Sequence, residues 1–286
     1  MSFSNAKFAV RAFHADLETA KPETISALLS RHVSDDYRWR GLHPFHEQSG
    51  ADAVSESFWT PFLTAFPTLQ RRTDIFFAGN SVTGDDHVWV CAMGNFLGLF
   101  DKSFLDIPAT GRLTHFRFAE FHRVVDGKIA ESAQFFDLLS LMDQAGVYPL
   151  PPQTGAHFLY PGPRTQDGLL FDDRPKEEGT ATINLVNDMV AWLGKSNAHD
   201  DVRMPREALA QHWVEDMLWF GPYGIGATMS VDRYQEQQPG QTSITDGEAN
   251  LRDLLASFVV MLFRLPLDSL RANALIRDNP KKVVFV

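Results

Sequence analysis

Apolar residues recur at helical spacing near the start of the chain. They line one face of two segments, residues 8–20 and 23–29, which are predicted to be helices. A third helix is predicted to begin at Gly50, in GADAVSESFWTPFLTAF, and to end at Pro67. Between the second and third helices, DDYRWRG alternates polar and apolar residues as a short strand does. The chain therefore opens with helices and a single strand.

Strand-like runs make up the next part of the chain. RRTDIFFAGNSV and DDHVWVCAMGNFLGLF come first, and a long predicted hairpin follows over residues 110–137. A short helix is predicted over residues 138–145. Helices followed by a long antiparallel sheet are typical of an α+β fold.

The hairpin is centred on VVDGKI, in which Gly127 suits the left-handed position of a type I turn followed by a bulge. That turn places Glu120 opposite Ser132, whereas a two-residue loop would place it opposite Ala133. With the bulged turn, apolar and polar residues share one face: Phe116, Phe118, Glu120, His122, Ala130, Ser132, Gln134 and Phe136. The opposite face carries Arg117, Arg123 and Glu131, which suit solvent or cross-strand ion pairs.

Glu120 is the strongest candidate for chemistry on the first of these faces. A carboxyl group on an apolar, concave face would have a raised pKa, as a general acid or base near neutral pH requires. The alternatives are a structural hydrogen bond or exposure at a strand edge. His122 is nearer the turn, so it is expected either at the rim of a pocket or on the surface.

Aromatic and histidine residues upstream could contribute to the same site. Trp39 and Trp59 fit either the core or the wall of a pocket. His43 and His46 have a spacing compatible with a metal site, but Pro44 and the loop setting favour capping or packing at the rim. No metal site is therefore predicted.

Composition excludes several function classes. The chain has 286 residues, of which 44% are hydrophobic and 22% charged, and this length suits two domains. The net charge of −10 argues against nucleic acid or an anionic membrane as a partner. No apolar run approaches the roughly 20 residues of a membrane span. The charged N-terminal segment does not resemble a signal peptide. The single cysteine, Cys91, fits a reducing cytoplasm.

The pattern of the first part returns later in the chain. HVSDDYRWRG, which begins at residue 32, and HWVEDMLWFG, which begins at residue 212, share a His, an acid, a Trp and a Gly at a constant offset of 180. Residues 1–147 are therefore predicted as one domain, residues 148–180 as a Pro/Gly-rich linker or arm, and residues 181–286 as a partial second copy. Leu251 to Phe263 has helical spacing, which predicts a divergent helical tail and no second working pocket.

WRGLHPFHEQSGADAV, IPATGR and HRVVDGKIAE together resemble the SnoaL-like polyketide cyclases of the nuclear transport factor two-like superfamily. The resemblance covers residues 26–147 and, in part, residues 209–238. It implies a cone, in which a strongly curved antiparallel sheet wraps around a pocket that the N-terminal helices close. It also implies a homodimer through the open face of the sheet, unless the linker and second copy cover that face. Such proteins include cyclases, isomerases, dehydratases, hydrolases and binding proteins, so the fold alone selects no reaction.

Carried over by position, the cyclase pattern expects a pocket histidine at Glu120 and a catalytic aspartate at Gln134. An amide cannot exchange a proton near neutral pH, which disfavours an aldol-type ring closure driven from Gln134. The ketosteroid isomerase pattern fits no better, because Trp39 and Arg40 fill the region of its base.

The sequence therefore predicts that the first domain binds a small hydrophobic molecule, cyclic or carbonyl-bearing, without a cofactor. Glu120 is the predicted acid or base, and the pocket is predicted to be lined by Trp39, His43, Trp59, Phe116, Phe118, His122, Ser132 and Gln134. The alternative is a non-catalytic ligand-binding or dimerisation module. A buried carboxyl group with a raised pKa favours the enzyme, whereas an exposed Glu120 or a pocket filled by side chains favours the module.

Overall fold

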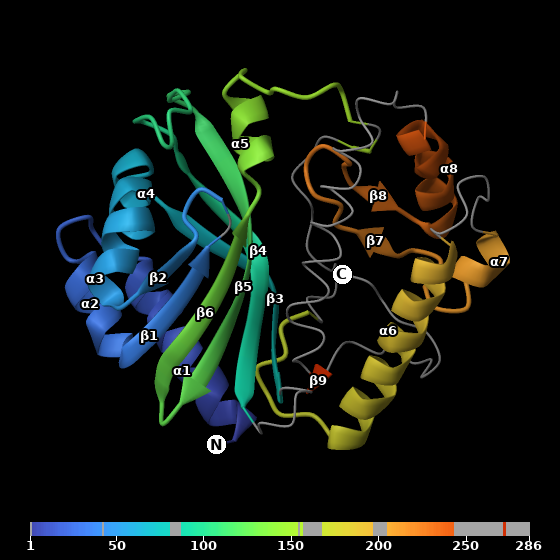
Figure 1. Cartoon of the computed structure of the whole chain (residues 1–286), viewed down its shortest axis with the longest axis horizontal. Helices are drawn as coiled ribbons and strands as arrows, with labels where there is room; N and C mark the ends of the chain where they lie inside the picture. The colour runs from blue at the N-terminus through green and yellow to red at the C-terminus, as the bar shows by residue number, and fades with distance from the viewer. Residues whose placement is uncertain are drawn as a thin grey trace. The chain divides into compact units, whose positions relative to one another are not determined.

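The computed structural model describes residues 2–41, 43–80, 87–153, 155–156, 168–196, 205–242 and 271–272. The chain forms two compact units (Figure 1). The first contains Met1–Pro149 and Gly168–Asp173, and the second contains Leu150–Asp167 and Arg174–Val286. The domain boundaries expected from the sequence, after residues 147 and 180, stay predictions. Part of the predicted linker, Gly168–Asp173, nevertheless belongs to the first unit, because Phe76 exchanges backbone hydrogen bonds with Gly168 and Leu170.

The first unit opens with helices α1 (Phe3–Leu17) and α2 (Ile25–His32). Helix α1 begins earlier than the apolar pattern predicts, because the Ser2 side chain caps it by accepting a hydrogen bond from the Asn5 backbone N–H. The third predicted helix is a continuous helical stretch from α3 (Ala51–Val54) through the π-helical turn η1 (Ser55–Trp59) to α4 (Thr60–Ala65).

The sheet of the first unit has the strand order β2-β1-β6-β5-β4-β3. Its strands are β1 (Val33–Gly41), β2 (Glu47–Ser49), β3 (Gln70–Asn80), β4 (Val88–Leu99), β5 (Leu113–Val125) and β6 (Lys128–Phe136). The neighbouring strands are antiparallel, as the sequence predicts, except for β1 and β6, which are parallel. No hairpin joins β1 to β6, and the long connection between them leaves the parallel direction open. Helix α5 (Leu138–Gln144) follows β6.

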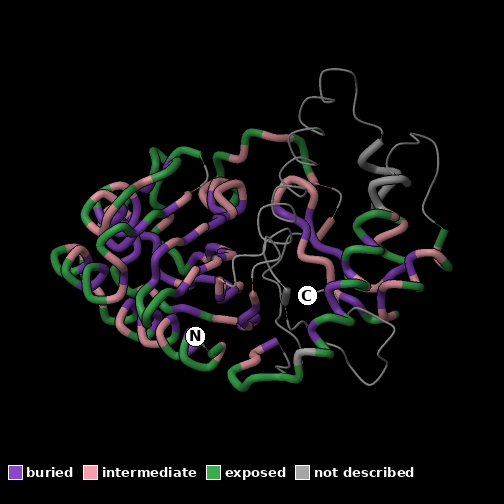
Figure 2. The backbone as a smooth tube through the Cα atoms, turned by 60° about the horizontal axis from the view of Figure 1, so that its bottom comes forward, coloured by how far each residue is buried: buried purple, intermediate pink, exposed green. Residues whose placement is uncertain are grey.

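The sheet is curved, and helices α1 to α4 lie on one side of it (Figure 1). The core fills the space between these helices and the inner face of the sheet, where the strands are largely buried (Figure 2). Aromatic rings dominate this core. The Phe58 ring stacks on Phe136 with centroids 4.4 Å apart and on Trp39 at 5.6 Å, and Phe116 stacks on Phe136 at 5.4 Å. The curved α+β fold expected from the resemblance is therefore confirmed for the first unit.

The register of the β5–β6 hairpin differs from both predicted alternatives. The turn has two central residues, Asp126 with φ 48° and Gly127 with φ 77°, as in a type I′ turn. A bulge between Arg123 and Val124 then shifts the pairing of the two strands by one more residue. Glu120 consequently lies opposite Gln134, and neither Ser132 nor Ala133 is its partner. The observed pairing is shifted by two residues from the pairing that the bulged turn predicts. Because side chains alternate with a period of two, Glu120 still lies on the predicted face.

The second unit has a small core of its own, formed by Met189, Leu209, Trp213, Met217 and Val231. Its elements are α6 (Lys176–Ser196), α7 (Arg206–Leu209), β7 (Leu218–Trp219), β8 (Thr228–Met229), α8 (Val231–Thr242) and β9 (Arg271–Ala272). Helix α6 begins before the predicted boundary at residue 181. The acidic residues Glu177 and Glu178 in its first turn suit a helix N-terminus.

The β7–β8 hairpin has the pairing that a repeat with an offset of 180 would give. Leu218 pairs with Met229 and Trp219 with Thr228, as Arg38 pairs with Ser49 and Trp39 with Gln48 in the first unit. Two helices precede each hairpin and a helix follows it. The tandem repeat stays a prediction, and the predicted helical tail at residues 251–263 lies outside the described residues.

None of the helices among the described residues is long and apolar enough to cross a membrane.

Two glycines of β4 allow a test of where the sheet can tolerate a side chain. A Cβ atom at Gly94 would lie 1.9 Å from the Arg72 carbonyl oxygen, beside the bulge in β3, whereas a Cβ atom at Gly98 would approach no atom closer than 3.4 Å. We expect Gly94→Ala to lower the free energy of unfolding by about 1–3 kcal/mol or more, because a backbone atom must move. Gly98→Ala is the matched control and is expected to change it by less than about 1 kcal/mol. Urea denaturation of both variants checks this, and equal effects would contradict it.

Candidate functional site

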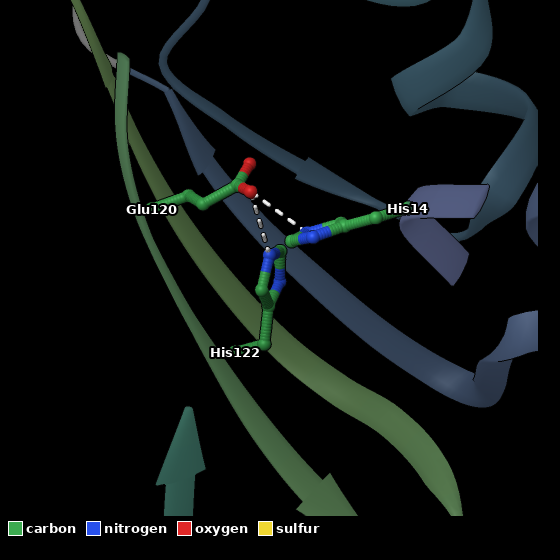
Figure 3. A group of neighbouring side chains, drawn as sticks. All are labelled: His14, Glu120 and His122. Atoms are coloured by element: carbon green, nitrogen blue, oxygen red, sulfur yellow. Dashed lines mark ion pairs between the residues drawn. The ribbon is translucent and has the colours of Figure 1, made fainter. Parts of the chain in front are cut away.

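Glu120 lies on the inner face of β5 and has no exposed surface. Three other elements bring polar side chains to it: α1 provides His14, β3 provides Arg71 and β6 provides Gln134. His122, two residues further along β5, lies on the same face. Figure 3 shows Glu120 and the two histidines directed toward one another. We call Glu120, His14, Arg71, His122 and Gln134 the polar cluster.

Both oxygens of the Glu120 carboxylate are occupied. Oε1 accepts a hydrogen bond from Arg71 Nη1 within an ion pair, and it lies 2.8 Å from His14 Nε2 and 3.7 Å from His122 Nε2. Oε2 accepts a hydrogen bond of 2.6 Å from Gln134 Nε2. The contact with His14 lacks the direction of a hydrogen bond, and the contact with His122 is too long for one. Both Nε2 atoms are therefore buried without a hydrogen-bond partner among the described residues.

The Arg71 side chain is only 5% exposed, and aromatic rings hold it in place. Its guanidinium carbon lies 4.5 Å from the centroid of the Phe118 ring and 4.7 Å from that of Phe96, within the range of cation–π attraction. Of its three nitrogens, Nη1 binds Glu120. Nε and Nη2 are buried and have no hydrogen-bond partner in the part of the chain that the structure describes.

Three further hydrogen bonds orient the side chains of the polar cluster. Trp39 Nε1 donates to Gln134 Oε1 at 2.5 Å, which turns the amide NH₂ toward Glu120. Tyr37 donates its hydroxyl proton to Ser132 Oγ at 2.9 Å, and Ser132 Oγ lies 2.7 Å from His122 Nδ1. Burial raises the pKa of Tyr37, which keeps it a donor. Ser132 can then donate to Nδ1, and this arrangement places the His122 proton on Nε2, which faces Glu120.

The pKa of Glu120 departs from its usual value in the direction opposite to the one the sequence predicted. Burial alone would raise it, but the Arg71 guanidinium, the neighbouring His14 and the contact with His122 outweigh burial and hold the pKa well below its usual range. Glu120 is therefore an ionised carboxylate at neutral pH and a weak base. The expectation of a raised pKa was wrong because it did not include Arg71.

His14 is neutral at neutral pH. Burial, reinforced by the positive charge of Arg71, lowers the pKa of its imidazole from 6.5 to about 4. The nearby carboxylate of Glu120 favours the tautomer that carries its proton on Nε2, and Nδ1 is then the nitrogen that can accept a proton. Within the polar cluster, proton transfer therefore suits the imidazole of His14 better than the carboxylate of Glu120.

His14, Glu120 and His122 also have the geometry of a possible metal site, since their ligand atoms lie within 4.8 Å of one another. Two imidazoles and a carboxylate are ligands that transition metals accept. Arg71 opposes this use, because its guanidinium already contacts the same Oε1 atom. A divalent cation added to the neutral Arg71–Glu120 pair would leave a large uncompensated positive charge in the core. The cluster suits proton chemistry better than metal binding.

The structure brings together most of the predicted site residues. Glu120, His122, Ser132, Gln134 and Trp39 belong to one hydrogen-bonded and ion-paired network. Phe118 contacts Arg71, and Phe116 and Trp59 lie in the adjoining aromatic core.

Two of the predicted positions differ. His122 is buried and does not lie at a rim. His43 is exposed in the connection between β1 and β2, where its ring lies 5.5 Å from that of His46, and it takes no part in the network.

Three members of the network were missed from the sequence: His14, Tyr37 and Arg71. His14 follows Val10 and Phe13 on the buried face of α1, and a titratable residue on an apolar helix face was a usable signal. The alternation of β3 places Arg71 on the inner face, but a bulge between Thr73 and Ile75 obscures that alternation in the sequence.

A surface groove of about 610 Å³ is separate from the polar cluster. It lies along α1 and the β5–β6 turn and is lined by Asn5, Phe8, Ala9, Ala12, His32, Asp126 and Gly127. None of the residues predicted from the sequence to form a pocket lines it.

Comparison with known proteins supports the family resemblance that the sequence of the first unit indicates. Residues 9–145 match the sequence profile of the family described as SnoaL-like polyketide cyclase. No curated protein matches the chain.

Several solved structures are similar to about half of this chain. TsrD from Streptomyces laurentii has 22% sequence identity and a TM-score of 0.39, and the alignment covers 49% of this chain and 96% of TsrD. AclR from Streptomyces galilaeus has 23% identity and a TM-score of 0.38, with coverage of 50% and 87%. An NTF2-like protein from Burkholderia thailandensis has 21% identity and a TM-score of 0.35, with coverage of 51% and 98%.

Removing one member of the buried Arg71–Glu120 ion pair is predicted to destabilise the fold more than removing both. Arg71→Ala leaves the Glu120 carboxylate without its main partner, so we expect the free energy of unfolding to fall by about 3–5 kcal/mol. The exposed neighbour Arg72→Ala is the control and should change it by less than about 0.5 kcal/mol. The double variant Arg71→Met/Glu120→Leu is expected to recover much of the loss, since it removes both charges. A loss below about 1 kcal/mol in Arg71→Ala would contradict the burial of the pair.

The lowered pKa of His14 predicts a dependence of stability on pH. Between pH 6.5 and about pH 4 the unfolded imidazole binds a proton that the folded one does not, so stability is lost as the pH falls through this window. The expected loss from this residue is about 3 kcal/mol. Chemical denaturation at several pH values checks it by comparing the wild type with His14→Gln, and parallel pH profiles would refute it.

Proposed function

The first unit of this chain belongs to the SnoaL-like polyketide cyclase family, and from that premise we propose that it binds a small, largely apolar, carbonyl-bearing molecule beside the polar cluster and transfers a proton on it. The proposal assigns the proton transfer to His14, with Glu120 as its ionised partner. It requires no cofactor.

One observation carries the proposal: an ionised carboxylate with no exposed surface faces two imidazoles whose Nε2 atoms are buried and have no hydrogen-bond partner among the described residues. Burying these groups carries a desolvation penalty that lowers the free energy of unfolding, and an apolar core of the same volume would carry no such penalty. Titratable groups whose pKa values are shifted by burial and by a specific charge partner are typical of functional sites. The surrounding aromatic rings suit a flat, apolar ligand.

The roles of the cluster follow from its charges and protons. His14 Nδ1 accepts a proton from the carbon next to the ligand carbonyl, and the imidazolium that forms is stabilised by the Glu120 carboxylate 2.8 Å from Nε2. His122, with its proton on Nε2, can donate to the oxygen on which negative charge develops. Glu120 thus keeps a place in catalysis as a partner of the base, in contrast to the role as proton carrier that the sequence suggested.

A non-catalytic ligand-binding or dimerisation module is the second candidate. It is favoured by the aromatic filling of the core, where the rings of Phe58, Phe136 and Trp39 stack directly on one another. The two candidates differ in whether the polar cluster moves a proton or only binds the ligand.

Exchange of the acidic α-hydrogens of a cyclic ketone separates the two candidates. The full chain is incubated with alpha-tetralone in D₂O, and proton NMR follows the loss of the α-hydrogen signal. We expect wild-type protein to accelerate exchange, and His14→Gln and Glu120→Gln each to reduce this acceleration by roughly a hundredfold, since positioned acid/base groups contribute about that factor. The exposed His43→Gln is the matched control and should keep the wild-type rate.

Near-UV circular dichroism establishes that each variant remains folded. Ligand binding without accelerated exchange would favour the non-catalytic module. If none of a panel of cyclic ketones and epoxides bound, the proposed function would be wrong.

A further inference from the structure

Resting on the proposed function, we propose that the ligand of the first unit carries a carboxylate and that this group binds side-on to Arg71, with one oxygen on Nε and the other on Nη2. The ligand class is then a small aromatic or cyclic carboxylic acid.

The argument begins with the planar geometry of the guanidinium group. The N–H of Nε and one N–H of Nη2 point in parallel along one edge, and this fork matches the two oxygens of a carboxylate. Glu120 binds Nη1 and leaves that edge unused. Both Nε and Nη2 are buried, and neither has a hydrogen-bond partner among the residues that the structure describes. An unpaired buried donor costs about 1–3 kcal/mol, so two on one edge are expensive unless a ligand pairs with them.

Arg71 is held so that this edge keeps its direction. Its guanidinium lies against the rings of Phe96 and Phe118, and Glu120 holds its Nη1 end. The side chain therefore cannot turn toward solvent without losing the ion pair and both ring contacts. An arginine fixed in this way is preorganised, and little conformational entropy is lost when a carboxylate binds.

The same rings indicate what the remainder of the ligand is. Phe96 and Phe118 are in contact with each other at a centroid distance of 4.5 Å and continue the aromatic core toward Phe116 and Trp59. An apolar ring attached to the carboxylate would contact this wall, whereas a polar body such as a sugar acid would have no partners there.

The charge balance adds a second consequence. Arg71 and Glu120 form a neutral pair, and a ligand carboxylate would leave one buried negative charge. A proton taken up by His14 restores neutrality, so binding should be coupled to proton uptake. The titratable and charged groups that face this position come from four elements: His14 of α1, Tyr37 of β1, Arg71 of β3, and Glu120 and His122 of β5. Burial raises the pKa of Tyr37, which keeps it protonated and leaves His14 as the acceptor.

The test compares two probes with the same ring system, naphthoate and methyl naphthyl ketone, by isothermal titration calorimetry of the full chain. We expect naphthoate to bind at least roughly tenfold more tightly than the ketone, because charge-assisted bidentate hydrogen bonds are stronger than neutral ones. Arg71→Lys keeps the charge but removes the fork, so it should weaken naphthoate binding by roughly tenfold or more and weaken binding of the ketone by a clearly smaller factor. Arg72→Lys, the exposed neighbour on β3, is the matched control and should leave both affinities unchanged.

Calorimetry in phosphate and in Tris, at neutral pH, measures the proton uptake, which should be close to one proton for naphthoate and absent for the ketone. Thermal unfolding establishes that Arg71→Lys is folded. If both probes bind equally, or if Arg71→Lys weakens both to the same extent, the carboxylate assignment is wrong while the proposed function stands. If neither probe binds, the carboxylate assignment is overturned, and tetralone exchange decides the proposed function independently.

Discussion

The ion pair between Arg71 and Glu120 is the interaction on which the interior of the first unit depends. It joins β3 to β5 across β4, beneath helix α1, and neither side chain has more than a small exposed fraction. A buried charge is tolerated only when it is paired and hydrogen-bonded, and Glu120 meets this condition through Arg71, Gln134 and the adjacent histidines. The position of α1 is tied to the same point, because its His14 contacts the same carboxylate oxygen.

An aromatic core surrounds this charged centre, and the two environments depend on each other. The rings of Phe96 and Phe118 remove water from around Arg71 and Glu120, which strengthens their attraction. The alternation of β5 provides both parts, since Phe116 and Phe118 share one face with Glu120 and His122. A polar site that reacts with an apolar molecule needs this combination of a dry wall and a few directed polar groups.

The two positions that the cyclase resemblance marks as chemically important are in direct contact here. Glu120 and Gln134 stand where that pattern expects a histidine and an aspartate, and a hydrogen bond of 2.6 Å joins them. The imidazoles come instead from His14 and His122, whose Nε2 atoms lie 2.8 Å and 3.7 Å from Glu120 Oε1. The arrangement of acid and base on the inner face therefore differs from the pattern, which is why the proposed chemistry is a proton transfer and does not extend to a particular ring closure.

The sequence by itself determined the order of helices and strands in the first unit and the face of the hairpin on which Glu120 lies. Both follow from local periodicity, and a register error of two residues left the face unchanged because side chains alternate with a period of two. Only the tertiary structure decided the protonation of the cluster. Arg71 is 49 residues from Glu120 in the chain, and His14 is further still, yet the charges within a few ångströms set the pKa of a buried carboxyl. Periodicity shows that an acid points inward, but not which charge meets it.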